Sequence, residues 1–382
     1  MNNESIKGTL KKLKKVIKNH KYQHTPFLDK DDQKSVLESI KNKNVSTYGK
    51  YIEVFEKRLK NYYKYNNIVT TVNGTSALHA ILTYLKAGIE DEILVQSFTF
   101  VATINPILYT GAYPHFIDSS IVSLSADPDK LDKYLNSDKF KFKNGILFNK
   151  STKKKIKILI ITHVYGYPAE IIKLKSVAKK YNLVLIEDAA ETLGSYLNKT
   201  PLGKFGDFSI LSFNGNKVIT TGGGGAILCK KNNDLKKITN LIIHSKVQKK
   251  DVIYYDNIGF NYKLPSLNAA LGVSQLKKIN YILKKKRELK KIYQSVFKYE
   301  NVNVYEEFNS NYKGNNWIIL LKVKERSIFF KLVKHAKYLG FGIKRAWKPL
   351  HNMKHLKKYQ KMNLSNCKKL FNSLLLLPSD IN

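Results

Sequence analysis

One lysine follows a short apolar run in a setting that suits an amine nucleophile. The run Phe208–Phe213 predicts a strand, and the polar turn Asn214–Asn216 leads from it to Lys217 and then to the four glycines Gly222–Gly225. Consecutive glycines disfavour a helix, where each costs about 1 kcal/mol relative to alanine, and suit a backbone that turns or lies against another group. A lysine amine partly removed from water can form a Schiff base with an aldehyde.

Two other interpretations of this lysine must be weighed. Lysine is the most abundant charged residue of the chain, and most lysines are solvated surface groups. A phosphate-binding P-loop needs Gly-Lys-Ser/Thr, whereas Asn216 precedes Lys217 and Val218 follows it, so the spacing excludes that loop. The nucleophile hypothesis therefore depends on partners elsewhere in the chain.

Carboxylates follow another predicted strand. The segment Glu187–Glu191, EDAAE, comes directly after the apolar run Leu183–Ile186. A carboxylate at the end of a buried strand must be paired, hydrogen-bonded or functional. Asp188 could face a protonated pyridine nitrogen and keep that ring electron-withdrawing, or it could be an ordinary helix N-cap.

Three further strand ends carry polar or aromatic side chains. In the turn that begins at Asn73, the N–H groups and hydroxyls of Gly74, Thr75 and Ser76 could hold a phosphate at a helix N-terminus, although capping would also explain them. Phe100 could stack on a cofactor ring or pack in the core. His163 closes another strand, and a lone histidine is more often structural than catalytic. A phosphate cradle, a ring stacker, an acid and an amine together describe a pyridoxal-phosphate site.

Composition bounds the class of protein. The 382 residues are 43% hydrophobic and 12% aromatic, which indicates a large domain with a buried core and a smaller one. No apolar run approaches about 20 residues, and no apolar stretch follows the first positive charges. Cys229 and Cys367 lie far apart without metal spacing. We expect a cytoplasmic protein with no metal and no insertion into a membrane.

The net charge of +38 favours anionic partners. The excess is nearly all lysine, spread over the whole length, and Asn, Ile and Tyr are over-used with it. This pattern indicates composition bias rather than a nucleic-acid-binding patch, and an anionic small substrate fits equally well. A non-enzymatic regulator that binds nucleic acid through this surface remains the alternative from another class.

The order of predicted elements gives the fold class. Ile6, Leu10, Leu13 and Ile17 recur at helical spacing, which predicts an amphipathic N-terminal helix that packs on the body or a partner subunit, or lies on a membrane. Helices are also predicted near 31–43 and 51–65. Strands and helices then alternate, which predicts a mainly parallel sheet covered on both faces. The predicted strands are Ile68–Val72, Glu92–Gln96, Pro114–Ile117, Ile156–Thr162 and Leu183–Ile186, with helices at Ala77–Lys86 and Ala169–Tyr181.

The remaining segments are predicted as follows. The insertion Asp118–Ser151 is expected to hold a helix near 127–135 and a hairpin. Leu264–Phe297 reads mostly as one long lysine-rich helix that leads to a second domain. That domain would contain a strand at 315–323, a helix at 327–339, a strand at 341–346 and a last helix at 366–374. The expected division is an N-terminal extension (1–26), a large cofactor-binding domain (27–280) and a small domain (281–382).

Six motifs in order resemble the DegT/DnrJ/EryC1/StrS family of nucleotide-sugar aminotransferases. The resemblance runs from about Phe27 to Pro378 and implies an α/β fold of the aspartate-aminotransferase type (fold type I) with pyridoxal 5′-phosphate as cofactor. The motifs are NGTSALH (73–79), QSFTFVAT (96–103), HVYGYP (163–168), EDAAE (187–191), GDFSILSFNGNKVITTGGGG (206–225) and NYKLPSLNAALG (261–272).

The resemblance also implies roles for single residues. Lys217 would carry the cofactor and shuttle the proton, and Asp188 would pair with the pyridine nitrogen. The phosphate would be held by Gly74, Thr75 and Ser212, with Ser76 nearby, and Phe100 would stack on the ring. Asn261 would reach the phosphate of a neighbouring subunit, which implies a homodimer with shared active sites. His163, Arg345, Trp347 and His351 are candidates for contacting the sugar nucleotide, or else ordinary surface and structural residues.

One residue that differs from most members of the family indicates a subgroup within it. Many members of the family have glutamine where Glu191 stands, near the cofactor's 3-hydroxyl. Glu191 and the form FNGNK resemble the subgroup that makes 4-amino-4,6-dideoxy sugars on UDP, whereas the related dehydratases carry histidine in place of Lys217. The resemblance thus implies amino transfer from glutamate to a UDP-linked 4-keto-6-deoxy sugar for bacterial surface glycans. Amination at the 3-position, or of GDP- or dTDP-sugars, is the alternative.

Overall fold

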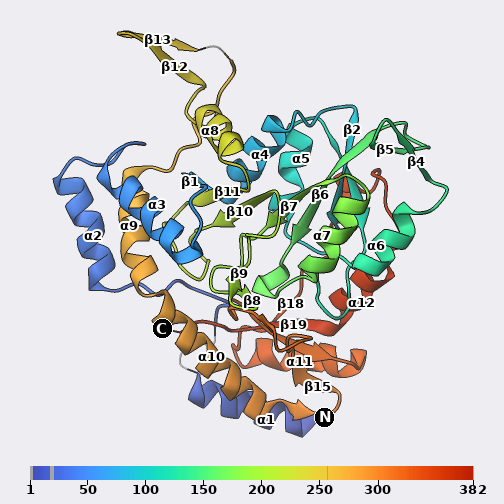
Figure 1. Cartoon of the computed structure of the whole chain (residues 1–382). Coiled ribbons are helices and arrows are strands. Elements are labelled where there is room, and N and C mark those ends of the chain that lie inside the picture. Colours follow the sequence, from blue (N-terminus) through green and yellow to red (C-terminus); the bar gives the residue numbers. More distant parts are fainter. Residues whose placement is uncertain (1–2, 18–20, 256, 382) are drawn as a thin grey trace.

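A mixed sheet, mostly parallel, forms the centre of the protein in the computed structural model, which describes residues 3–17, 21–255 and 257–381 (Figure 1). The central strands β10, β7, β6, β2 and β3 run parallel, and β11 is antiparallel to both β10 and β1. In spatial order the strands are β1 (Ile68–Thr71), β11 (Gly225–Cys229), β10 (Phe208–Ser212), β7 (Val184–Asp188), β6 (Lys155–Thr162), β2 (Asp91–Gln96) and β3 (Tyr113–Ile117).

Both faces of this sheet are buried because its strands are apolar on both sides. In β6, Ile158 and Ile160 belong to one hydrophobic cluster, while Leu159 and Ile161 belong to another on the opposite face. Continuous apolar strands of this kind are typical of parallel sheets covered by helices. The helices of these layers are α3 (Lys50–Tyr63), α4 (Gly74–Tyr84), α5 (Asn105–Tyr109), α6 (Pro128–Leu135), α7 (Ile171–Lys180), α8 (Asn232–Leu241) and α9 (Ser266–Lys277), with α2 (Lys30–Lys41) against α9. The predicted fold class is confirmed.

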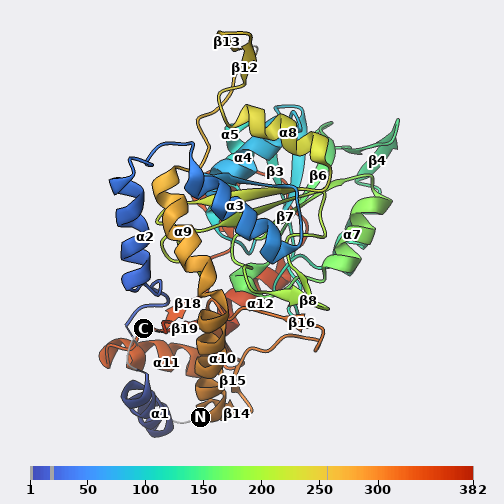
Figure 2. The same ribbon diagram turned by 60° about the vertical axis from the view of Figure 1, so that its left-hand side comes forward.

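A third hydrophobic cluster joins the N-terminal helix to the C-terminal part of the chain. Ile6, Leu10 and Leu13 of α1 (Asn3–Val16) are fully buried in it. We call this part the C-terminal layer; α1 and α10 lie side by side in it (Figures 1 and 2). It comprises α1, α10 (Ile279–Val296), α11 (Arg326–Tyr338), α12 (Ser365–Ser373) and a sheet in the order β14 (Lys298–Tyr299), β15 (Val302–Val304), β17 (Ile319–Val323), β19 (Leu374–Leu377) and β18 (Lys344–Arg345).

We propose the division into a large domain, a small domain and an N-terminal extension on the basis of these clusters, with α1 packed on the small domain. No helix in the described ranges is long and apolar enough to cross a bilayer.

Smaller elements complete the chain. The insertion after β3 contains α6 and a hairpin, as predicted. The second strand of this hairpin pairs with the first residues of β6. A separate hairpin projects from the body beyond α8 (Figures 1 and 2). These strands are β4 (Phe140–Lys143) and β5 (Ile146–Asn149), β12 (Lys246–Lys249) and β13 (Val252–Tyr255), and a small sheet of β16 (Tyr312–Lys313), β8 (Tyr196–Leu197) and β9 (Thr200–Pro201). Single 3₁₀ turns occupy Val101–Thr103, Val164–Gly166, Leu350–Asn352 and Lys354–Leu356.

Three predicted elements were wrong in extent. The strand predicted at 315–323 is limited to Ile319–Val323. The segment 264–297 forms two helices rather than one, because α9 ends at Lys277 and α10 begins at Ile279. Lys278 lies at the break, where its amine pairs with Asp29 and, at 2.8 Å, with Asp32 near the start of α2. The strand predicted at 341–346 is reduced to Lys344–Arg345, since only these residues pair with β19.

The packing of α1 gives a testable prediction. Leu10→Ala removes a fully buried side chain and is expected to lower the free energy of unfolding by about 2–5 kcal/mol. Urea denaturation followed by tryptophan fluorescence measures the change, with the exposed neighbour Lys11→Ala as control. Equal stability of the two variants would contradict the packing of α1 on the C-terminal layer.

Candidate active site

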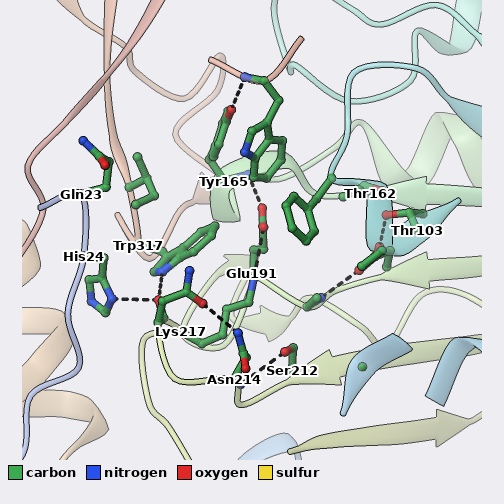
Figure 3. A pocket seen from close by; sticks show the side chains of 18 of the residues that line it. Gln23, His24, Thr103, Thr162, Tyr165, Glu191, Ser212, Asn214, Lys217 and Trp317 are labelled. Carbon is green, nitrogen blue, oxygen red and sulfur yellow. Dashed lines mark hydrogen bonds and ion pairs between the residues drawn. The ribbon is translucent and has the colours of Figure 1, made fainter. Parts of the chain in front are cut away.

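A cavity of about 710 Å³ opens where the carboxyl ends of the central strands meet the C-terminal layer (Figure 3). Ligands of open α/β sheets bind at this edge. Most of the residues that the sequence singled out line the cavity: Gly74, Thr75, Phe100, Asp188, Glu191, Ser212, Lys217, Arg345 and Trp347. Ser76, His163, Asn261 and His351 do not.

Lys217 is held by the turn that follows β10. Its backbone N–H donates to the carbonyl of Asn214 at 3.0 Å, and the loop closes where Phe213 N–H donates to the carbonyl of Gly224. The side chain is only 13% exposed. Its amine lies 3.2 Å from Glu191 Oε1 and 4.1 Å from the centre of the Trp317 ring. The amine is therefore confined between an anion and an aromatic face.

The glycine run lets β11 pass against the turn that begins α4. A Cβ on Gly225 would meet the backbone of Asn73 and Gly74 at 2.6–2.7 Å, so no larger residue fits there. Gly222 takes a φ of +78°, which side chains disfavour. The glycines thus place the Lys217 loop beside the turn at 73–75.

That turn has the form of a phosphate cradle. Asn73 caps α4 because its Oδ1 accepts from the N–H of Ser76 at 2.7 Å, so Ser76 is used locally and lies outside the cavity. Gly74 and Thr75 occupy the first helical positions, where N–H groups have no acceptor within a helix. With Ser212 across the cavity, these donors suit an anion at the positive end of α4.

Asp188 ends β7 and is 6% exposed. Burial raises the pKa of its carboxyl, while the hydroxyl of Thr103 at 2.6 Å and the N–H of Ala190 at 3.2 Å oppose the shift by donating to it. A buried carboxylate with a raised pKa is suited to a cationic N–H partner such as a protonated pyridine.

Glu191 is the second buried carboxylate of the cavity. Its Oε2 accepts from the N–H of Tyr165 at 2.7 Å, and its Oε1 contacts Lys217. Burial raises the pKa of Glu191; the Lys217 ammonium lowers it and the charge of Asp188 raises it further. The two carboxylates thus share one lysine in a place with little water.

His163 has a structural position. Its Nδ1 accepts from the N–H of Ala169, so Nε2 carries the proton and donates to Glu187 at 3.0 Å. Glu187 is fully buried and also accepts from the N–H groups of Gly203, Phe205 and Gly206. Both nitrogens of His163 are therefore engaged beneath the cavity, away from the substrate contact expected for it.

Aromatic side chains form one wall of the cavity. Phe100 is half exposed, and Trp347 contacts it and also the buried Tyr165, with ring centres 5.5 and 4.2 Å apart. Arg345 lines the rim with its guanidinium over Phe371, and Lys344 beside it is also exposed.

Two expected residues lie elsewhere in this chain. His351 bonds Ser97 Oγ through Nδ1 at 2.7 Å, behind the wall of the cavity. Asn261 pairs with Ile243 at the base of the β12–β13 hairpin, so its contact with a phosphate would have to be made in another copy of the chain.

Several lining residues were missed from the sequence. Trp317 and the N-terminal residues Tyr22, Gln23 and His24 stand in no pattern with the motifs, because folding brings them to the cavity from distant segments. Tyr165 lies within the motif HVYGYP and Lys344 directly precedes Arg345, so both could have been found from the sequence. Thr103 lies within the motif QSFTFVAT and could have been found there. Within the described ranges no three His, Cys, Asp or Glu side chains gather as a metal site.

The lysine and the aspartate at the carboxyl ends of neighbouring strands, and the donors at a helix start, form an arrangement that a pyridoxal-phosphate cofactor would fit. The sequence model of the DegT/DnrJ/EryC1/StrS aminotransferase family matches residues 26–382, so the chain belongs to that family. It is accordingly a pyridoxal-phosphate-dependent enzyme of the nucleotide-sugar aminotransferase class.

Known proteins agree with this assignment. The chain is 32% identical to a GDP-perosamine synthase of Vibrio cholerae over 76% of its length and 74% of the relative's. It is 29% identical to a UDP-4-amino-4,6-dideoxy-N-acetyl-β-L-altrosamine transaminase of Campylobacter jejuni over 92% and 90%. The fold is similar to that of Helicobacter pylori PseC, an aminotransferase involved in pseudaminic acid biosynthesis (TM-score 0.83, 23% identity, 94% and 93% covered).

The raised pKa of Glu191 gives a prediction for the cofactor-free protein. Charging Glu191 costs more in the folded state, so the cost is absent below the unfolded pKa of about 4.3 and complete above the folded pKa. Glu191→Gln should therefore raise the melting temperature at pH 8 and leave it unchanged near pH 4. Calorimetry across this range measures the effect, with the exposed Glu90→Gln as control. Destabilisation at pH 8 would contradict the prediction.

Proposed function

We propose that the enzyme transfers an amino group from glutamate to the keto carbon of a nucleotide-linked 4-keto-6-deoxy sugar, carried on UDP, for surface glycan synthesis. The observation that carries this proposal is the buried set of Lys217, Glu191 and Asp188 at neighbouring strand ends of a chain in this family. The C. jejuni relative, whose name specifies UDP and a 4-amino-4,6-dideoxy sugar, supports the substrate. A GDP-sugar is the second candidate, because the V. cholerae relative is somewhat more similar.

The residues present fit the cofactor. Gly74, Thr75 and Ser212 would hold the phosphate, Asp188 the ring nitrogen, Phe100 the ring face and Glu191 the side near the 3-hydroxyl. Bound pyridoxal phosphate supplies an aldehyde that takes up the amino group and a ring that withdraws electrons from the carbon losing a proton.

The chain's own side chains do the positioning and the proton transfer. Lys217 Nζ moves the proton, because it is the amine held at the centre of the cavity. Asp188 keeps its partner nitrogen protonated, since a buried carboxylate favours a cation beside it. The aromatic wall of Phe100, Trp347 and Tyr165 limits the access of water.

Removing the amine tests the reaction. The wild type is expected to gain a visible absorbance band on addition of pyridoxal phosphate, and the band should decline when glutamate is added. Lys217→Ala should lose the cofactor on gel filtration and react with glutamate at least about a hundredfold more slowly. Lys230→Ala, at an exposed lysine after β11, is the control. A wild-type band that ignores glutamate would exclude glutamate as donor.

The exposed cations Lys344 and Arg345 are proposed to bind the diphosphate of the substrate. Lys344→Ala and Arg345→Ala should each raise KM for the nucleotide sugar about fivefold or more, since contacts to charged groups contribute at least about 1 kcal/mol. The reaction with glutamate should be unchanged, and the effect should weaken in high salt. Steady-state kinetics with UDP- and GDP-sugars measure this, with the exposed Lys348→Ala as control. An unchanged KM would place the diphosphate elsewhere.

We infer that two copies of the chain assemble through the β12–β13 hairpin. The hairpin exposes four large apolar or aromatic side chains by about half or more, as surfaces that contact another protein do: Val252, Ile253, Tyr254 and Tyr255. Asn261 lies at the base of the hairpin, from where it would reach the site of the neighbouring copy. The double variant Ile253→Asp/Tyr255→Asp should sediment at the monomer mass of 43.9 kDa, whereas the wild type and the remote control Tyr338→Asp should sediment at about twice that mass. A monomeric wild type would exclude the shared site.

A further inference from the structure

The carbonyl oxygen of Asn216, the residue before Lys217, accepts two hydrogen bonds from distant segments. The donors are His24 and Trp317, whose side chains lie near Lys217 (Figure 3). The Nε1–H of Trp317 donates at 2.6 Å, and Nδ1 of His24 lies at 2.8 Å. Trp317 is 3% exposed and presents its ring to the Lys217 amine. Both hydrogen bonds therefore hold the turn that carries Lys217 from segments outside the proposed large domain.

His24 belongs to a segment that we call the N-terminal strap, residues 21–28. Within it the Gln23 amide donates to the carbonyl of Gly342, the Gln23 carbonyl accepts from Ser379 N–H at 2.7 Å, and the Thr25 hydroxyl donates to Asp380. Gln23 and Thr25, on either side of His24, are thus tied to the C-terminal part of the chain. The strap up to Thr25, like α1, lies before the residues that match the family.

The chemistry of the His24 contact is fixed by its acceptor. A carbonyl only accepts, so Nδ1 must carry the proton. Burial, followed by the charges of Lys286 and Lys217, lowers the pKa of His24 well below its ordinary value, which keeps the ring neutral near pH 7. Lys286 is itself fully buried and donates to the carbonyl of Trp317 at 3.0 Å. Trp317 is consequently held both by its ring nitrogen and by its backbone.

We propose that His24 is a positioning residue for Lys217, acting with Trp317 through the Asn216 carbonyl to keep the amine between Glu191 and the indole ring. Reaction rates depend steeply on the placement of the reacting group, so a turn free to shift would slow every step at Nζ. The segment before the family match would then contribute to catalysis without touching the reacting atoms. This inference rests on the proposed function in taking Lys217 as the reacting amine.

The test compares variants that keep or remove the donor. His24→Ala removes it, whereas His24→Asn keeps an N–H at the same distance from the backbone. Trp317→Phe keeps a ring against Lys217 but loses Nε1–H. The readouts are the rate at which the visible band forms when pyridoxal phosphate is added to cofactor-free protein, the rate of its decline with glutamate, and the melting temperature.

His24→Ala and Trp317→Phe are each expected to slow both rates roughly five- to tenfold, and His24→Asn to restore them to within about twofold of wild type. Because the two donors share one acceptor, the effects of the two substitutions should not be independent. The fold-decrease in rate of the double variant His24→Ala/Trp317→Phe should exceed the product of the fold-decreases of the two single variants. Lys21→Ala, at an exposed position of the strap, should match the wild type.

Equal impairment of His24→Asn and His24→Ala would overturn the inference, since a lost packing contact rather than a lost donor would then explain the effect. Wild-type rates in His24→Ala would overturn it as well. If the wild type itself formed no band, the proposed function would fall together with this inference; a normal wild type with an unaffected His24→Ala would remove this inference alone.

Discussion

Two carboxylates buried at the end of one strand are the constraint on which the site depends. Burying unpaired charge is costly, and Asp188 and Glu191 are each about one-twentieth exposed. Hydrogen bonds from neighbouring groups offset this cost. The Thr103 hydroxyl and the Ala190 N–H donate to Asp188, and the Tyr165 N–H and the Lys217 amine donate to Glu191. One lysine still leaves one negative charge without a partner cation, which is what a site for a protonated ring nitrogen requires.

The backbone segments around the two buried carboxylates pack closely together. Tyr165 donates its N–H to Glu191 from a left-handed conformation, φ +57°. Gly225 brings β11 within a distance of the 73–74 turn that no side chain would allow. Strain of this kind is maintained where the surrounding packing determines it, and it is common at functional sites. The side chains of the site are thus positioned by the closely packed ends of the central strands rather than by exposed loops.

The sequence predicted what is local to the strands and missed what folding brings together. The parallel strands, the turn at Gly74 and Thr75, and the positions of Asp188 and Lys217 at neighbouring strand ends follow from apolar runs and the short motifs beside them. Helical periodicity alone predicted 264–297 as one helix, because the spacing of apolar residues does not register the break at Lys278, whose amine pairs with Asp32 of α2. Trp317 and His24 reach the cavity only through tertiary contacts, so no spacing in the chain could indicate them.

Few of the positive charges that give the chain its net charge of +38 lie in the cavity. Within the cavity Lys217 stands against two carboxylates, Asp188 and Glu191, and the exposed cations lie at the rim in Lys344 and Arg345. Charges at a rim act through solvent and are screened by salt, whereas the buried set acts at short range in a place of low polarity. The chemistry of amino transfer is therefore determined by the few buried charges. Under the proposed function, selection of the nucleotide would depend on the exposed residues at the rim, which lie outside the six family motifs.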